Sequence, residues 1–251
     1  MLYTLGGVPN INQHDWFTLL LFPVIWIYAE MPLINRITLM RKYPRTPHLP
    51  YSRTISEEDA IAKKDYLLGK EVVVLEKMDG ECTAMYSDYI HARSLDSAHH
   101  PSRSWVKQLH AKVKSQIPEN MIIYGENLYA KHSIPYSNLN SYFMVFNIHI
   151  FPSLWLSWQD VRNTVELIGL HTVPLLYEGV WTERLASELI KHVEADPNTE
   201  GFVVRLASSF IEKNWEESIG KYVSSNFEIS SDHWTKNRLI ANKLKAQTLR
   251  Y

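Results

Sequence analysis

The feature that most constrains the fold is a run of four aliphatic residues, Val72–Leu75, which ends abruptly at charged residues. A short apolar run with polar residues on both sides predicts a buried β-strand. Lys77 stands just beyond this run, between Glu76 and Asp79, and Gly80 follows. A lysine at the end of a buried strand loses water, so it is either held by a carboxylate or placed there to react.

The order of the expected elements favours an α+β fold over a regular βαβ alternation. Strands are expected at 71–76, 83–87, 90–93, 120–130, 142–151, 173–179, 200–206 and 220–224. Helices are expected at 56–69, 100–118, 157–170 and 182–194, the first with Ser56 as N-cap and Gly69 as its end. Hairpins mixed with helices indicate two largely antiparallel sheets with flanking helices.

Length and composition bound the class of protein. The 251 residues suit one domain with a small appendage, and 45% hydrophobic with 21% charged residues is typical of a globular chain. A formal net charge of −1 excludes a strongly basic protein, so any contact with nucleic acid must come from a local patch. The single cysteine, Cys82, excludes a disulfide framework and a cysteine-rich zinc site, and it favours an intracellular, cytoplasmic setting.

Three segments are expected along the chain: an appended N-terminal segment at 1–39, the main domain at 40–230 and a short basic helical tail at 231–251. The first segment contains the apolar stretch Trp16–Tyr28, which is shorter than the roughly 20 residues of a membrane span and is interrupted by Pro23. We therefore expect a packed element or an interface there, and no stable membrane span. The proline-rich stretch from Met40 to Arg53 predicts an extended arm.

A lysine followed by Asp-Gly is common by chance, and its simplest interpretation is a surface turn. Here further motifs follow in order: HARS with Arg93, YGENLYA with Glu126, VFNIHI with Phe146, EGFVVR with Glu200, and GKYV with Lys221. This ordered set resembles the covalent nucleotidyltransferases, which comprise ATP-dependent RNA and DNA ligases and mRNA capping enzymes. The motif sequences are most similar to those of the ATP-dependent RNA ligase family, and the resemblance extends from about Arg41 to Asn226.

The resemblance implies an ATP-grasp-like nucleotidyltransferase domain that requires ATP and Mg²⁺ or Mn²⁺. Lys77 is expected to attack the α-phosphate of ATP and release pyrophosphate, because an amine nucleophile gives a labile phosphoramidate. AMP then passes to a 5′-phosphate RNA end, and a 3′-hydroxyl attacks to join the strands, a reaction suited to RNA repair. A free lysine has a pKa of roughly 10.4, and we expect burial and nearby cations to lower the pKa of Lys77.

The same resemblance implies roles for the residues that bind the nucleotide. Glu76 is expected to position the adenine through its backbone, and Asp79 to orient the turn and contact the ribose or the lysine. Arg93 is expected at the ribose or a phosphate, and Glu126 at a ribose hydroxyl. Phe146 is expected to stack on the adenine ring, although a phenylalanine in an apolar strand is by default a core residue.

Two further residues are expected to act on the phosphates. Glu200 is expected to hold a divalent cation or its water, because hard oxygen ligands suit Mg²⁺. Lys221 is expected to bind the α-phosphate and to stabilise the charge that develops there. The sequence departs from the family at two sites: Cys82 stands where many RNA ligases carry asparagine, and Val223 where related ligases often have a second lysine. Lys213 and Lys236 are candidates to replace that lysine.

Contacts to RNA are expected outside the motifs as well. His99 and His100 lie in a polar loop, and the tail contributes four basic residues, Lys236, Arg238, Lys243 and Lys245. A solvated polar surface is the simpler interpretation of both groups. Three other hypotheses stay open at this point: a DNA ligase, a capping-type guanylyltransferase, and a degenerate nucleic-acid-binding module without turnover.

Overall fold

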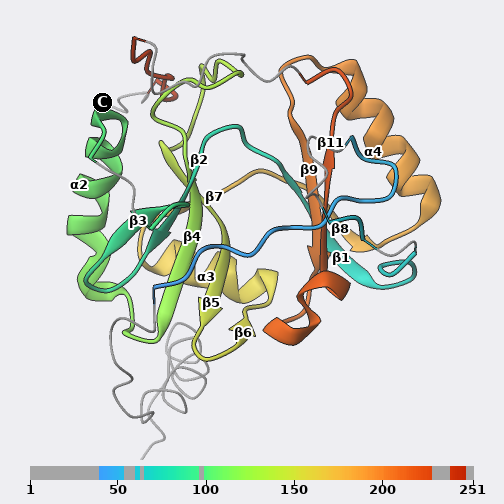
Figure 1. Cartoon of the computed structure of the whole chain (residues 1–251), viewed down its shortest axis with the longest axis horizontal. Helices are drawn as coiled ribbons and strands as arrows, with labels where there is room; N and C mark the ends of the chain where they lie inside the picture. Colours follow the sequence, from blue (N-terminus) through green and yellow to red (C-terminus); the bar gives the residue numbers. More distant parts are fainter. Residues whose placement is uncertain (1–39, 54–59, 63–64, 96–98, 228–237, 247–251) are drawn as a thin grey trace, which may run out of the picture. The chain divides into compact units, whose positions relative to one another are not determined.

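The computed structural model of the chain describes residues 40–53, 60–62, 65–95, 99–227 and 238–246. These residues belong to one compact unit, Met40–Tyr251, and the expected appended segment at 1–39 lies outside them. The unit contains two sheets, each built almost wholly of antiparallel strand pairs, with helices beside them (Figure 1). The predicted α+β class is therefore confirmed.

The first sheet has four antiparallel strands in the order β11–β9–β1–β8. Their bounds are β1 Glu71–Glu76, β8 Leu175–Val180, β9 Gly201–Leu206 and β11 Ile219–Val223. The run Val72–Leu75 is at most 2% exposed, as its apolar composition predicts. One face is covered by α4 (Glu183–Ala195), whose Ala186 and Val193 pack into the same cluster as Val72 and Val74.

The second sheet has seven strands in the order β10–β6–β5–β4–β2–β3, with β7 paired in parallel to β5. The strands are β2 Glu81–Met85, β3 Ile90–Ala92, β4 Met121–Asn127, β5 Phe143–Ile150, β6 Leu154–Trp155, β7 His171–Thr172 and β10 Phe210–Ile211. The short strands β6, β7 and β10 were not predicted, because two residues carry no periodicity.

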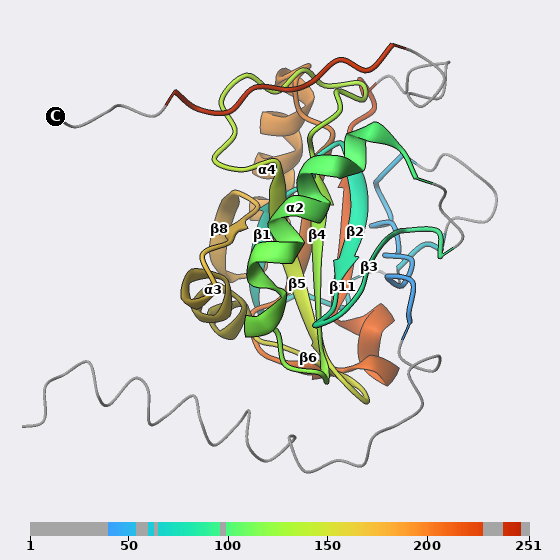
Figure 2. The same cartoon turned by 90° about the vertical axis from the view of Figure 1, so that its left-hand side faces the viewer.

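Helices cover the second sheet on the side away from the first. Figures 1 and 2 show α2 (Ser104–Val113) lying along this face, between the 3-10 turns Pro101–Arg103 and Lys114–Gln116. The helix α3 (Trp158–Leu167) packs against β5 and β7, and a third 3-10 helix spans Glu212–Glu217. Within the described parts of the chain, no helix has the length and apolar character needed to cross a membrane.

Residues 47–49 of the arm extend the first sheet beyond β11. The Lys221 N–H donates to the Pro47 carbonyl at 2.9 Å, and the Leu49 N–H donates to the Lys221 carbonyl at 2.8 Å. On the other side of the arm, residues 60–62 pair with His48 through two backbone hydrogen bonds of 2.7 Å. The helix predicted at 56–69 is therefore wrong at 60–62, because the backbone there is used in strand pairing, and at 65–69, which form turns. Residues 54–59 and 63–64 lie outside the described residues.

The tail departs from the expected helix over residues 238–246. This stretch runs extended, with isolated bridges from Ala241 to Ala130 and from Leu244 to Leu139. The buried Asn242 side chain donates to the Leu128 carbonyl at 2.8 Å and accepts from the Tyr136 N–H at 2.9 Å. Pairing with the loop that follows β4 thus replaces intrahelical hydrogen bonds in the tail.

The end of β11 is held by Glu194 in the last turn of α4. Glu194 accepts hydrogen bonds from the Tyr222 hydroxyl at 2.5 Å, the Ser225 N–H at 2.8 Å and the Ser225 hydroxyl at 2.6 Å. Partial burial acts to raise the pKa of the Glu194 carboxyl, but these donors outweigh it and lower the pKa to about 2. An ionised carboxylate therefore ties α4 to the strand that carries Lys221.

We expect Glu194→Gln to destabilise the protein at neutral pH by an amount that shrinks in acid. Because the folded pKa lies below the ordinary value of 4.5, the stabilisation is complete above about pH 5 and is lost as the pH falls toward 2. Urea unfolding midpoints of wild type and variant, measured from about pH 7 down to about pH 3, should therefore converge. A gap that stays constant over this range would show that the charge of Glu194 is not what stabilises the contact.

Candidate active site

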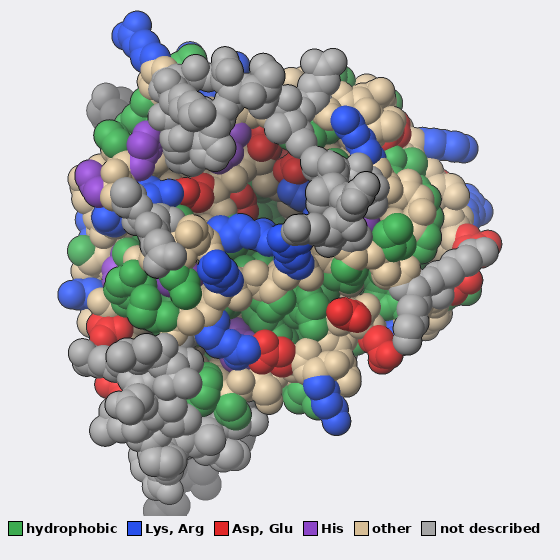
Figure 3. All heavy atoms as spheres, viewed as in Figure 1, with side chains coloured by type: hydrophobic (Ala, Val, Ile, Leu, Met, Phe, Trp, Pro, Cys, Tyr) green, Lys and Arg blue, Asp and Glu red, His purple; other side chains and the backbone are tan. Residues whose placement is uncertain are grey.

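A cavity of about 410 Å³ lies between the two sheets and receives residues from both. Figure 3 shows a hollow near the centre of this face, with Lys and Arg side chains gathered around it. A cavity of this size is typical of a small-ligand site, and the seven charged residues among its described lining suit a charged ligand. Among its lining are seven of the residues singled out in the sequence: Glu76, Lys77, Cys82, Arg93, Glu126, Phe146 and Lys221.

Lys77 lies where the chain leaves the first sheet and enters the second. β1 ends at Glu76 in the first sheet, and β2 begins at Glu81 in the second. The Lys77 N–H donates to the Gly201 carbonyl at 3.0 Å, which ties this crossing to β9. At Gly80 an added Cβ would lie 2.7 Å from the Asn127 carbonyl oxygen, so only glycine allows so close a passage.

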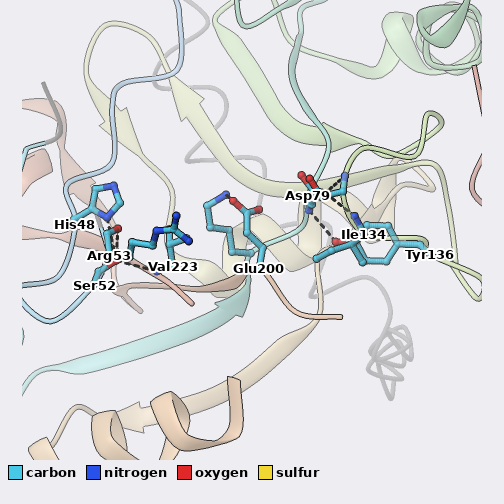
Figure 4. A network of polar contacts seen from close by, with 10 residues as sticks. His48, Ser52, Arg53, Asp79, Ile134, Tyr136, Glu200 and Val223 are labelled. Atoms are coloured by element: carbon cyan, nitrogen blue, oxygen red, sulfur yellow. Dashed lines mark hydrogen bonds and ion pairs between the residues drawn. The ribbon is translucent and has the colours of Figure 1, made fainter. Parts of the chain in front are cut away.

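Glu200 directly precedes β9 and forms an ion pair with Lys77. The Nζ–Oε1 distance is 2.5 Å, and the two side chains are 24% and 10% exposed (Figure 4). Gly201 follows, and a Cβ there would lie 1.9 Å from the Tyr222 carbonyl oxygen of β11. The glycine after Glu200 therefore lets β9 and β11 approach, and the expected nucleophile and metal-binding carboxylate are brought together by adjacent strands.

The electrostatics of the nucleotide-free site differ from the expectation for Lys77. Burial acts to lower the pKa of Lys77, but Glu200, and behind it Glu126 and Asp79, outweigh that effect and raise the pKa. The expected lowering is therefore wrong for the protein without nucleotide. Burial also raises the pKa of Glu200, and it raises that of Glu126 to about 8, where Lys77 opposes the shift and Glu200 adds to it.

Asp79 does not line the cavity. Its carboxylate accepts hydrogen bonds from the Ser133 N–H at 2.7 Å and the Ile134 N–H at 2.9 Å, and its own N–H donates to the Tyr136 hydroxyl at 2.8 Å (Figure 4). These contacts hold the loop that follows β4 against the Lys77 crossing. The structure therefore gives Asp79 a part in orienting the turn and brings no part of it to the cavity where a ribose would lie.

The second sheet supplies the other wall of the cavity. Cys82 on β2 lies opposite Glu126 on β4, and Arg93 follows β3 and is exposed. Phe146 on β5 is half-buried, and its ring meets Tyr43 edge-on at 5.0 Å between centroids, while it also lines the cavity. Burial raises the pKa of the Cys82 thiol, with Glu126 adding to it, which fits a small protonated thiol in the wall.

Several residues named from the sequence lie away from the cavity. His100 caps the 3-10 turn before α2 by accepting from the Ser102 N–H at 3.3 Å, and neither His99 nor His100 lines the cavity. Lys213 is exposed and does not line it either, while Lys236 lies outside the described residues. The described basic residues of the tail, namely Arg238, Lys243 and Lys245, are exposed.

The cavity also contains residues that the sequence did not identify. Tyr43, Arg45 and Thr46 come from the arm, and Val203 and Arg205 come from β9. The Arg205 side chain is fully buried and donates to the Asn147 side-chain oxygen at 2.6 Å; burial lowers its pKa to about 10. Arg205 is the last residue of the EGFVVR motif. The residues that an extended arm contacts, in contrast, cannot be predicted from a local sequence pattern.

The comparisons with known proteins agree with this arrangement. A family model described as RNA ligase matches residues 70–223, which is more than half of the chain. The chain belongs to the RNA ligase family. Within the chain, the matched range runs from just before β1 to the end of β11 and so contains every motif residue of the cavity.

Solved structures show a similar fold at low sequence identity. An archaeal ATP-dependent RNA ligase is 20% identical with a TM-score of 0.50, and the match covers 74% of this chain and 49% of that one. A variant of the Naegleria gruberi RNA ligase, solved with ATP and Mn, is 14% identical with a TM-score of 0.46, covering 73% and 60% of the two chains. The chain thus spans about half the length of the archaeal ligase. The comparison with curated proteins found no match.

We expect Glu126→Gln to change how stability depends on pH in the nucleotide-free protein. A carboxyl whose folded pKa of about 8 exceeds its ordinary value of 4.5 makes the folded state lose stability as the pH rises from 4.5 to 8. The glutamine variant lacks this proton, so its stability relative to wild type should increase over that interval and level off above it. Urea midpoints at several pH values measure this, and parallel profiles would contradict the raised pKa.

Proposed function

We propose that this protein is an ATP-dependent RNA ligase that forms a lysyl-AMP intermediate on Lys77 within an ATP-grasp-like nucleotidyltransferase domain. The observation that carries the proposal is the meeting of three residues from neighbouring parts of the first sheet: Lys77 and Lys221 line one cavity between the sheets, and Glu200, which directly precedes β9, pairs with Lys77 beside it. Membership of the RNA ligase family, and the order of the motifs, support ATP and RNA ends as the substrates.

The walls of the cavity fit a purine nucleotide. The ring of Phe146 and the apolar side chain of Val203 line it from facing sheets, so a planar base between them would be held on both faces. Glu126, with a pKa of about 8, is mostly protonated at neutral pH and is able both to donate to and accept from a ribose hydroxyl. Arg93 and Lys221 supply positive charge for the phosphates.

The charges around Lys77 fit a divalent cation that arrives with the nucleotide. The carboxylates of Glu200 and Asp79 both act on the single ammonium of Lys77, while Glu126 beside them is mostly protonated at neutral pH, so two negative charges face one ammonium. Among the described residues, no three His, Cys, Asp or Glu side chains form a metal site by themselves. One carboxylate, Glu200, completed by phosphate oxygens and water, is the pattern that Mg²⁺ or Mn²⁺ adopts in such sites, where the ion neutralises phosphate charge.

The reaction then follows from the positions of the residues. Lys77 passes a proton to water as its pairing with Glu200 ends, and its Nζ forms a bond to the α-phosphorus as the bond to pyrophosphate breaks. Nζ then gives a second proton to water, which leaves an uncharged phosphoramidate nitrogen. Lys221 is on β11, which lies on the other side of β9 from β1, and it stabilises the negative charge on the oxygens of the α-phosphate. AMP is next transferred to the 5′-phosphate of an RNA end, and the 3′-hydroxyl of a second end displaces AMP to form the phosphodiester. Sealing of RNA breaks is the task we assign to this sequence of steps.

We expect intact-mass analysis after incubation with ATP and Mg²⁺ or Mn²⁺ to show one added AMP on the wild type and none on Lys77→Ala. The reason is that, of the two lysines that line the cavity among the described residues, Lys77 is the one at the crossing between the sheets, and it pairs with Glu200. Lys112→Ala, which removes an exposed lysine from α2, serves as the matched control and should gain AMP normally. Before the assay the protein is treated with pyrophosphate to remove any AMP already bound.

Failure of the wild type to gain AMP would remove the enzyme proposal and favour a nucleic-acid-binding module without turnover. If the adduct forms with GTP in preference to ATP, a capping-type guanylyltransferase is the better assignment. Nicked duplexes whose 3′-hydroxyl is on a ribose or on a deoxyribose then distinguish an RNA ligase from a DNA ligase. The two classes of enzyme differ in which strand they accept as the source of the attacking 3′-hydroxyl.

A further inference from the structure

The arm runs beside β11 in the same direction and contacts it along its length. Pro47 and Leu49 pair with Lys221, the Ser52 hydroxyl accepts from the Val223 N–H at 2.9 Å, and the Arg53 guanidinium donates to the Phe227 carbonyl at 2.9 Å. We propose that Ser52, with the arm that carries it, is a positioning residue that places Lys221 for the transfer of AMP. This inference rests on the proposed function and adds a residue outside the motifs to it.

The backbone of Lys221 is held on the arm side. Its single N–H donates to the Pro47 carbonyl at 2.9 Å, and its carbonyl accepts from the Leu49 N–H at 2.8 Å. A backbone N–H has one hydrogen, so this N–H is not available to the neighbouring strand β9. The position of Lys221 at the cavity is thus set by the arm as much as by the sheet to which β11 belongs.

Ser52 completes this ladder where the arm turns away. Residues 221 and 223 alternate with residue 222, so their side chains share a face and their N–H groups share an edge. The Val223 N–H donates to the Ser52 hydroxyl, which takes the place of a backbone carbonyl (Figure 4). The His48 Nδ1 lies 3.0 Å from the same hydroxyl. The Ser52 hydroxyl therefore extends the pairing between the arm and β11 to Val223, the last residue of the strand.

Close packing keeps the arm in this place. A Cβ at Gly220 would lie 2.9 Å from the Leu49 Cδ2 and 2.2 Å from the Tyr66 hydroxyl, so the glycine lets the arm approach β11. The preceding part of the arm, from Tyr43 to Thr46, lines the same cavity. The arm therefore lines the cavity and also contacts the strand that carries Lys221.

The test measures the rate of lysyl-AMP formation in a single turnover as ATP is varied, on the full chain. Ser52→Ala should lower the maximal rate by about 10- to 100-fold while the ATP concentration at half-maximal rate changes by less than about 3-fold, because misplacing a catalytic group costs rate more than binding. Ser52→Thr keeps the hydroxyl, so its maximal rate should stay close to that of the wild type. Ser52→Val has the shape of threonine without the hydroxyl, so its maximal rate should fall as that of Ser52→Ala does.

A matched control separates positioning from loss of stability. Ser157 caps α3 by accepting from the Asp160 N–H at 3.1 Å, so Ser157→Ala removes a comparable hydrogen bond far from β11 in sequence. We expect Ser157→Ala to lower the thermal midpoint and leave the rate within about 2-fold of wild type. In a Lys221→Ala background, Ser52→Ala should cause no further loss of rate, because both changes remove the same contribution.

The outcomes distinguish the two proposals. No adduct on the wild type overturns the proposed function and this inference with it. An adduct on the wild type with Ser52→Ala as fast as Ser157→Ala, or with Ser52→Val as fast as Ser52→Thr, overturns the inference alone. Additive losses from Ser52→Ala and Lys221→Ala would also overturn it, since Ser52 would then act through another group.

Discussion

The ion pair between Lys77 and Glu200 is the interaction on which the arrangement of the cavity depends. It joins the end of β1 to the start of β9 at the point where the chain crosses between sheets. Removing one partner of a largely buried pair leaves an uncompensated charge, at a cost of about 3–5 kcal/mol. The pair thus favours the charged ammonium form of Lys77.

The close approach of three strands makes this pairing possible. Gly201 lets β9 and β11 lie closer than any side chain would allow, and Gly80 does the same for the crossing beside β4. Neither glycine contributes a functional group, yet each determines where a charged neighbour lies. The glycines of the Asp-Gly and Glu-Gly motifs therefore have a geometric role that is separate from the chemistry of the carboxylates before them.

The strand β11 is held from three sides, which suits a strand that carries a charged residue into a cavity. β9 pairs with one edge, the arm with the other, and Glu194 of α4 ties down the end. Without the arm, the outer edge of β11 would expose unpaired backbone groups. The arm covers that edge, so a segment outside the motifs becomes part of the support for the site.

The sequence by itself determined the α+β class, the long strands and helices, and the set of motif residues that line the cavity. Those features follow from local periodicity, capping residues and ordered motifs, all of which are written in short stretches of chain. It misjudged residues 60–62 and 238–246, where a helix was expected and backbone pairing with distant segments prevails.

Only the tertiary structure decided the rest, since the balance of charges depends on which distant groups meet. It set the direction of the pKa shift of Lys77, because three carboxylates converge on it from different strands. It placed Asp79 against the loop after β4 instead of in the cavity, and it brought the arm beside Lys221. Contacts between residues far apart in the sequence have no local signal, so the sequence identified the motif residues and the fold determined what surrounds them.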